Sequence, residues 1–501
     1  MGSSTASVEG PAWVDTSVER IRGLFPLSVE RYLNQAVGDF VPSVTTVTNV
    51  ARSYPLHGLV MAEASARGLD SNGTRLLLRR AEVVMSLASI AHASHPDHPS
   101  WMPDPHGRDK LRTAWEQGPI DLGEVTGAGP SAYATDPWGF LNPYFGSEFR
   151  LGILGTPWTT PGPGFNEDRV RSALGQVLDL AEAWTIVTRP MAEEASHLCI
   201  CAARQSADGE WLAARLAGDR SEPHTVASTL AETMSLVARA LTADEVSSEE
   251  GLADVIRFGE LLDEDSSLSQ SPVAHRWRGI CLRQTAVLAW RELWFRLSVR
   301  AHEAGGFLPI SELQDWFSDL APTQSLGEFA DSLPPTMARG KTLPAERQLA
   351  AALEDPMLSL AHVLLSARRA VELEGDQEWG YLGEPSNLDR NQELSPLWVR
   401  HTIDRWRSRP LRDFCSFLVK VLLDRSQRVA LDKAGYRNGR YVLPARVLLR
   451  DGFVEWRDHE GAGAPPLRLE RIVHIGRQVG LFEVSEMGTW RVGRLGHYIA
   501  S

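Results

Sequence analysis

The densest group of potential metal ligands lies between residues 91 and 109, where histidines and aspartates are interleaved with prolines. Imidazole and carboxylate groups are ligands for zinc, manganese and iron. His92 and His95 stand one helical turn apart if a helix continues that far. The candidate ligands are His92, His95, His98, His106 and Asp109. A divalent metal held here would indicate a metal-dependent hydrolase or nuclease.

The same segment has an interpretation without a metal. Its prolines favour extended backbone at several of these positions, and the spacing of the histidines matches no closed structural zinc site. On this interpretation the segment is a solvated junction between a helix and a loop. The leading hypothesis is therefore a chain without a cofactor, and the divalent-metal site is its alternative.

A second kind of chemistry is suggested by arginines near the C-terminus, because guanidinium groups bind phosphate through several directed N–H donors. Some lie in a helical segment from residue 467 to 480, some close to a following hairpin, and two in an earlier helix. The candidate nucleic-acid-binding residues are Arg425, Arg428, Arg468, Arg471, Arg477, Arg491 and Arg494.

The charge of the chain is unevenly distributed. Residues 395–501 carry 19 Lys and Arg against 11 Asp and Glu, a net charge of +8, whereas the whole chain carries −13. A basic segment joined to an acidic body favours contact with nucleic acid. The same charge also suits docking onto an acidic protein surface, and both interpretations stay open.

Catalytic motifs are missing from the sequence. Gly340-Lys341-Thr342 ends like a phosphate-binding loop, but Pro335 stands where its first glycine belongs. There is no Gly-x-Ser-x-Gly elbow and no His-Glu-x-x-His. None of the four lysines follows an acidic residue by two positions, as in restriction-type nucleases. The sequence therefore names no enzyme.

The cysteines and a proline-flanked histidine receive structural interpretations. Cys199, Cys201, Cys281 and Cys415 show no paired metal-binding spacing, and the first two are too close for an ordinary disulfide. Free thiols predict a reducing cytoplasm. His57 has no nucleophile at a readable spacing, so a buried, hydrogen-bonded role is expected.

The elements that must position these residues are mainly helices. Apolar spacing predicts a helix over 44–64 kinked at Pro55, another over 74–93, and a long one over 273–303. Two further helices are expected over 396–407 and 411–433, followed by short strands. The fold class is thus mainly α: a multi-helix bundle with a smaller α+β domain at the C-terminus.

Composition and charge divide the chain into four segments. Residues 1–117 form an N-terminal helical region, and residues 118–168 a loop region rich in glycine, proline and aromatic residues. Residues 169–394 form a helical bundle, and residues 395–501 the basic domain.

The last segment resembles a winged-helix domain, because a helix is followed by two short β-type runs around Gly488. That resemblance implies a final helix in the major groove and arginines on phosphates. The segment Val44–Ala64, the arginine-rich helix from Trp277 to Trp294 and the C-terminal ending are similar to uncharacterised bacterial proteins encoded among anti-phage and restriction genes. This second resemblance implies partners in a protein complex.

We expect a cytoplasmic bacterial protein that acts without catalysis, as a DNA-associated or adaptor subunit of a multi-protein defence system. Its partners would be double-stranded DNA and other protein subunits. No membrane association is expected, since the polar N-terminus lacks a secretory pattern and the apolar windows are short. The alternatives are the metal-dependent enzyme described above and a pure protein-interaction scaffold.

Overall fold

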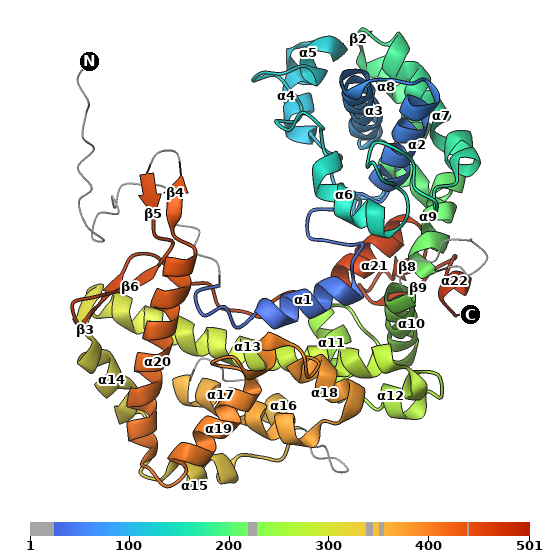
Figure 1. Ribbon diagram of the computed structural model, residues 1–501. Helices are drawn as coiled ribbons and strands as arrows, with labels where there is room; N and C mark the ends of the chain where they lie inside the picture. Colours follow the sequence, from blue (N-terminus) through green and yellow to red (C-terminus); the bar gives the residue numbers. More distant parts are fainter. Residues whose placement is uncertain (1–24, 219–227, 337–343, 350–354, 438–439, 501) are drawn as a thin grey trace, which may run out of the picture. The chain divides into compact units, whose positions relative to one another are not determined.

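The computed structural model describes residues 25–218, 228–336, 344–349, 355–437 and 440–500. This part of the chain is mainly helical, with a few short antiparallel strand pairs (Figure 1). The mainly α class is confirmed. The start of the expected N-terminal helical region, residues 1–24, lies outside the described residues.

The chain forms two compact units, each built from segments distant in sequence. Unit 1 comprises residues 1–36 and 275–465, and unit 2 comprises residues 37–274 and 466–501. The expected boundaries at 118, 169 and 395 do not coincide with this division, and the expected domain 395–501 is divided at Pro465. Composition and charge describe short stretches of sequence. The two units are defined instead by contacts between segments that are distant in sequence.

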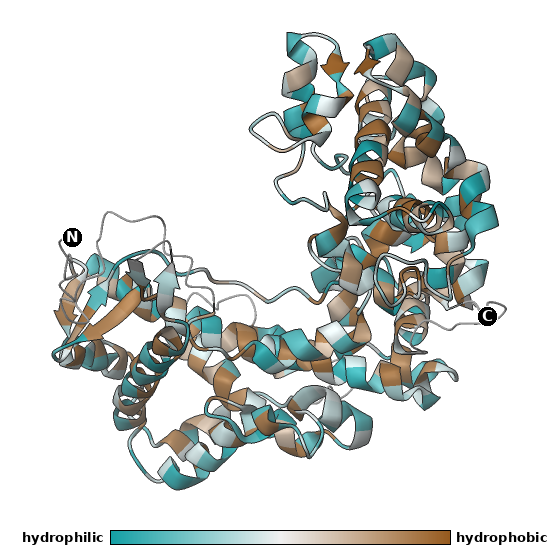
Figure 2. Ribbon diagram, turned by 45° about the horizontal axis from the view of Figure 1, so that its top comes forward, coloured by the Kyte–Doolittle hydropathy of each residue, from teal (hydrophilic) through white to brown (hydrophobic). Residues whose placement is uncertain are grey.

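Unit 2 contains a bundle in which α2, α3, α7 and α9 pack against one another. Figure 2 shows hydrophobic and hydrophilic residues on different sides of many helices, as amphipathic packing requires. The elements of unit 2 before the bundle's last helix are α2 (Ser53–Ala66), α3 (Ser71–His92), α4 (Arg108–Gln117), β1 (Ile120–Asp121), α5 (Leu122–Thr126), α6 (Leu141–Arg150), α7 (Glu167–Ala183), β2 (Ile186–Val187), α8 (Arg189–Glu194), η1 (Ser196–Leu198) and η2 (Ile200–Arg204).

In unit 2, the helices at the end of the first segment pack against the elements of the second segment, residues 466–501. Helix α9 contacts α10, and both contact the C-terminal elements. These elements are α9 (Ala207–Ala217), α10 (Ser228–Ala243), α11 (Glu249–Phe258), α12 (Leu261–Glu264), η3 (Leu268–Gln270), α21 (Leu469–Gln478), β8 (Phe482–Val484), β9 (Trp490–Val492) and α22 (His497–Ala500). Helix α1 (Arg31–Phe40) contains the boundary between the two units.

Local sequence explains where the first helices of the bundle begin. Helix α2 begins at Ser53, so Pro55 lies in its first turn, where a missing N–H leaves no intrahelical bond unmade. The expected kink at Pro55 in a longer helix was therefore wrong. Helix α3 is capped by Asp70, whose Oδ1 accepts a 2.7 Å hydrogen bond from the N–H of Gly73.

The C-terminal helix and hairpin agree with the pattern in the sequence. Helix α21 is followed by the antiparallel strands β8 and β9, in which Phe482 pairs with Val492 and Val484 with Trp490. Gly488 has φ +83° in the turn between them. A Cβ on Gly476 would lie 2.4 Å from Cδ2 of Phe482, so the helix and the hairpin pack closely only because this residue is glycine.

Unit 1 is organised along α13, which begins at Pro272 just before the boundary of the unit. Trp290 donates a 3.0 Å hydrogen bond to the carbonyl of Leu394, and Gln284 a 2.7 Å bond to that of Pro465. Within the same unit α14 packs against α20, and α17 packs against α19. The helices are α13 (Pro272–Glu303), α14 (Ile310–Asp319), α15 (Leu326–Ser332), α16 (Ala345–Leu349), α17 (Pro356–Glu372), α18 (Gly375–Leu382), η5 (Leu388–Asn391), α19 (Pro396–Trp406) and α20 (Leu411–Asp432).

Unit 1 also holds a three-stranded antiparallel sheet in the order β3–β7–β6. Strand β7 is central, with Val454 opposite Leu308 on one side and Leu449 on the other. The strands of the unit are β3 (Phe307–Pro309), β4 (Gly435–Arg437), β5 (Arg440–Val442), β6 (Val447–Arg450) and β7 (Phe453–Trp456). Helix α20 packs on β6, so the segment 411–456 belongs to this sheet rather than to the final helix and hairpin.

Candidate functional site

A buried acid–base network joins α2, α3 and α6 in unit 2. Nδ1 of His57 lies 2.6 Å from Oε1 of Glu148, and Nε2 lies 2.9 Å from Oε1 of Glu82. Burial lowers the pKa of His57, but the two carboxylates outweigh it and raise that pKa to about 10. His57 is therefore an imidazolium that donates to both carboxylates.

The network is closed by the loop region that precedes and begins α6. The hydroxyl of Tyr133 donates to Oε2 of Glu82, and the N–H of Phe140 donates to both oxygens of the same carboxylate at 3.1 and 3.2 Å. The exposed fraction of the His57 side chain is 0%. The expected buried, hydrogen-bonded histidine is confirmed. Without access for a substrate, this group holds helices together.

The expected metal ligands are not brought together as one set. His106 lies in a different environment, with Nε2 2.8 Å from the hydroxyl of Tyr144 and its ring stacked on Phe140 at 4.3 Å between centroids. Burial lowers the pKa of His106 to about 4. Asp109 is exposed in the first turn of α4. The prolines separate these two residues from the histidines at the end of α3.

His92, His95 and His98 do lie together. The ring of His92 is 5.5 Å from that of His95 and 5.5 Å from that of His98, measured between centroids. Nδ1 of His92 lies 3.3 Å from Sγ of Cys201. The ligand atoms of His92, Cys199 and Cys201 are all within 4.8 Å of one another. The thiols could not be connected with His92 from the sequence, because no local spacing relates them to a histidine 109 residues earlier.

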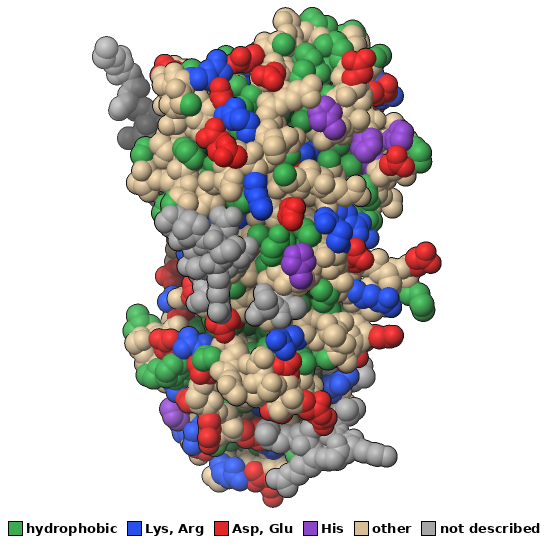
Figure 3. Space-filling model, turned by 90° about the vertical axis from the view of Figure 1, so that its right-hand side faces the viewer, with side chains coloured by type: hydrophobic (Ala, Val, Ile, Leu, Met, Phe, Trp, Pro, Cys, Tyr) green, Lys and Arg blue, Asp and Glu red, His purple; other side chains and the backbone are tan. Residues whose placement is uncertain are grey.

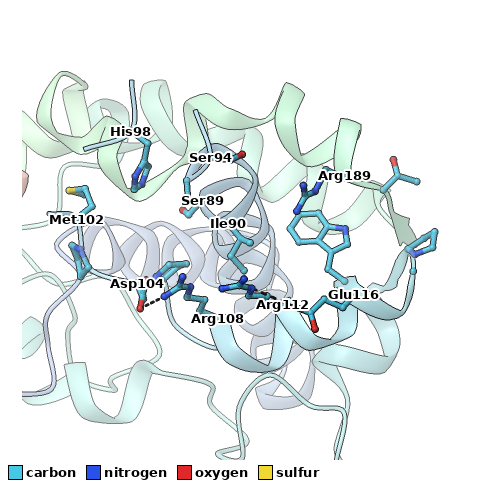
Figure 4. Close-up of a pocket in the computed structure, with 17 residues that line it drawn as sticks. Ser89, Ile90, Ser94, His98, Met102, Asp104, Arg108, Arg112, Glu116 and Arg189 are labelled. Carbon is cyan, nitrogen blue, oxygen red and sulfur yellow. Dashed lines mark ion pairs between the residues drawn. The ribbon is translucent and has the colours of Figure 1, made fainter. Parts of the chain in front are cut away.

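Beside these histidines the surface is hollowed into a pocket of about 690 Å³. Figure 4 shows its lining, which comes from the end of α3, the loop after it, α4 and the start of α8. The ion pairs are Arg108 with Asp104 at 2.5 Å and Arg112 with Glu116 at 3.6 Å. The guanidinium carbon of Arg189 lies 5.8 Å from the centre of the Trp115 ring. Two carboxylates thus balance the charge of two of the three arginines that line the pocket. His98 is the histidine in its lining.

Three of the candidate nucleic-acid-binding arginines are engaged within their own units. Nε of Arg425 donates to the carbonyl of Leu27 at 3.0 Å, and Arg428 pairs with Glu393. Arg468 has φ +62° at the N-terminus of α21, and its guanidinium lies 3.5 Å from the carbonyls of Val41 and Val44. Burial lowers the pKa of Arg468. These contacts fix the chain rather than present cations to a ligand.

The outer face of α21 carries positive charge. Arg471, His474 and Arg477 are the partly exposed basic residues of this helix, at a spacing that places them on one side. Burial lowers the pKa of His474, and the neighbouring Arg471 and Arg477 lower it further. The guanidinium carbon of Arg477 lies 3.7 Å from the centre of the Trp101 ring.

More arginines lie next to this face. Nη2 of Arg494 donates to the carbonyl of Arg204 at 2.9 Å, and Arg204 pairs with Glu483 at 2.7 Å. Arg491 is exposed on β9, opposite Glu483 of β8, and lines a surface pocket with Asp244 and Glu245. Within the described residues, neither Arg471 nor Arg491 has an ion-pair partner. We call Arg204, Arg471, His474, Arg477 and Arg494 the α21 basic face, and we include in it Arg491 of the hairpin that follows α21.

One face of the molecule is electrostatically mixed. Figure 3 shows positive and negative side chains interspersed on the face that it draws, with no broad area of one sign. A local cluster, rather than a field over a whole side of the molecule, is therefore the relevant electrostatic feature.

Comparisons with known proteins do not assign this chain to a family: no family model, no curated protein and no solved structure matches it. Among the described helices, none combines the length and the apolar character needed to cross a bilayer.

Proposed function

We propose that the protein is a non-catalytic DNA-associated subunit that binds duplex phosphates through the α21 basic face. The observation that carries the proposal is the alignment of Arg471, His474 and Arg477 along one side of α21, with Arg494 and Arg204 beside them. A double helix presents closely spaced phosphates, and two arginines on one short helix with two more beside it match that spacing better than scattered cations do.

The neighbourhood of the face supports an anionic ligand. Glu470 lies near His474 and Glu483 near Arg477, and Glu483 already pairs with Arg204. Stacking on Trp101 restricts the guanidinium of Arg477, so less side-chain entropy is lost when it binds a phosphate. The ligand would thus meet cations that are partly ordered beforehand.

The helix and hairpin suggest how the duplex would dock. We propose that α21 approaches the major groove, as the final helix of a winged-helix domain does, while Arg491 and Arg494 contact the backbone near the hairpin. Base reading is not part of the proposal, because arginine contacts to phosphates carry no sequence information. Affinity should be largely independent of sequence.

We further propose that the protein works as an adaptor within a multi-protein bacterial system of phage defence. The support is the resemblance noted in the sequence together with the missing catalytic motifs. DNA contact through the small α21 basic face leaves the other surfaces of both units for protein subunits. The rival adaptor without nucleic-acid affinity predicts no binding in the experiment below.

The test is fluorescence anisotropy of a labelled DNA duplex titrated with the full chain over a salt series. The variant Arg471→Ala/Arg491→Ala removes two cations that have no ion pair within the described residues. Each lost phosphate contact should lower the slope of log affinity against log salt by about 0.9, so the double variant should lose about 2 from that slope.

The matched control is Arg400→Ala/Arg412→Ala, which removes two exposed arginines of unit 1 outside the α21 basic face. This control should retain the affinity and the slope of the wild-type chain. Equal losses in both double variants would show that charge in general, and not this face, attracts the duplex. No binding by the wild-type chain at low salt would favour the protein-interaction scaffold.

A further inference from the structure

The end of α3 and the short helix η2 bring together ligand atoms that suit a soft metal ion. His92 is the last residue of α3, and Cys199 and Cys201 lie at the start of η2. Nδ1 of His92 is 3.3 Å from Sγ of Cys201, and the three ligand atoms are all within 4.8 Å of one another. We propose that His92, Cys199 and Cys201 bind Zn²⁺.

The separation of Cys201 and His92 is close to the value for tetrahedral coordination. Zinc bonds of about 2.3 Å to sulfur and about 2.0–2.1 Å to nitrogen place two sulfur ligands about 3.8 Å apart, and a sulfur and a nitrogen ligand about 3.6 Å apart. The observed 3.3 Å between Cys201 and His92 lies a few tenths of an ångström below the second value. Side-chain rotation of that size is enough to admit the ion.

The backbone around the two thiols is held in place by buried groups. Nη1 of Arg52 donates to the carbonyl of Cys199 at 2.7 Å and to that of His197 at 2.9 Å. The N–H of Ile200 donates to Oγ of Ser89 at 3.0 Å, which fixes the loop to α3 one turn before His92. The ligands are therefore preorganised, as a metal site with a supporting outer shell requires.

Zinc binds cysteine as the thiolate and histidine as the neutral imidazole. Binding at this site should therefore release protons and strengthen as the pH rises.

Three protein ligands leave the fourth coordination position to water or to another side chain. His98 is the candidate that faces the pocket, because its ring lies 5.5 Å from that of His92 and it lines the pocket of Figure 4. His95 lies equally close, but it is exposed and its Nδ1 is 3.4 Å from a carboxylate oxygen of Asp97. A pocket beside an open zinc position is where a ligand or substrate would meet the metal.

The experiment titrates Co²⁺ into the full chain after chelation under reducing conditions, and then displaces the cobalt with Zn²⁺. We expect one ion per chain, a near-ultraviolet thiolate-to-cobalt charge-transfer band, and visible bands of the strength that tetrahedral coordination gives. Cys201→Ser should remove most of the charge-transfer band. It should weaken binding by more than the roughly 10–100-fold that outer-shell changes cost.

The matched control is Cys415→Ala, which removes a buried thiol of unit 1 and should leave the cobalt spectrum unchanged. A second measurement uses the wild-type chain alone: alkylation of thiols, mapped by mass spectrometry, should slow at the partly exposed Cys201 when Zn²⁺ is added. The proposal is overturned if Cys201 reacts at the same rate with and without zinc. It is also overturned if Cys415→Ala and Cys201→Ser change the cobalt spectrum equally.

Discussion

Arg52 and Asp208 form a two-point ion pair inside unit 2. Nε of Arg52 lies 3.0 Å from Oδ2 of Asp208, and Nη2 lies 3.3 Å from Oδ1. The exposed fraction of the side chain is 1% for Arg52 and 0% for Asp208. The same guanidinium holds the carbonyls of His197 and Cys199, so one buried pair connects the start of α2, the start of α9 and the loop of the proposed zinc ligands.

Replacing Asp208 by Asn should destabilise the protein strongly. The arginine would stay charged and buried without a counter-charge, and breaking a buried pair in this way costs about 3–5 kcal/mol. Urea denaturation checks the prediction. The exposed pair of Lys420 with Asp424 provides the control, since Asp424→Asn should change the free energy of unfolding by less than about 1 kcal/mol. Equal effects would contradict the role assigned to the buried pair.

His57 should make the stability of the protein depend on pH in the alkaline range. Its pKa is raised to about 10 in the folded protein and is near 6.5 in the unfolded chain. Its contribution is therefore complete below about pH 6.5 and is lost as the pH rises towards 10. Unfolding free energies measured from pH 6 to pH 10 should fall more steeply for the wild-type chain than for His57→Gln, which cannot titrate.

A measurement on the wild-type chain tests the same prediction if His57→Gln does not fold. The imidazole of His57 can be followed by NMR, and its resonance should stay in the protonated position through neutral pH. Glu82 and Glu148 both face this ring, so they supply the negative charge that holds the proton. A midpoint near pH 6.5 would show that the two carboxylates do not act as described.

Gly476 should tolerate no side chain. An added Cβ would lie 2.4 Å from Cδ2 of Phe482, a buried ring of β8, so Gly476→Ala should cost about 1–3 kcal/mol through overpacking. Gly38 is the control, because it lies within α1 and a Cβ there would meet nothing within 4 Å. Thermal unfolding should show Gly38→Ala unchanged or slightly stabilised. A destabilised Gly38→Ala together with a stable Gly476→Ala would refute this packing argument.

The sequence allowed prediction of elements whose own residues carry the pattern. Apolar periodicity located α3, the long α13, and α21, and Gly488 indicated the hairpin that follows. Periodicity shows that a helix has an apolar side but not which segment covers that side. Two features could therefore not be predicted. One is the pairing of β3 with β7, which are far apart in sequence, and the other is the division of the chain at Pro465.

Some residues of the candidate sites could likewise be predicted from local sequence, and others could not. Arg471 and Arg477 could be selected because their helical spacing relative to buried residues is local information. Arg468 has the same residue type but turns inward at a left-handed backbone position, which no spacing rule revealed. His92 was found as a potential ligand, whereas its cysteine neighbours depend on a loop that Arg52 and Ser89 hold from other helices.

The stacking of Arg477 on Trp101 gives a sharper test of the proposed DNA contact. If the ring orders the guanidinium for phosphate, Trp101→Leu should weaken duplex binding by about 2–5-fold, which corresponds to a cation–π energy of about 0.5–1 kcal/mol. Unit 1 offers a matched pair, since the guanidinium carbon of Arg276 lies 5.0 Å from the centre of the Trp379 ring. Trp379→Leu removes the same kind of contact away from the α21 basic face and should leave DNA affinity unchanged. Anisotropy titrations of the two variants at one salt concentration make the comparison. Equal affinity in both would mean that the guanidinium of Arg477 is not ordered for phosphate by its aromatic neighbour.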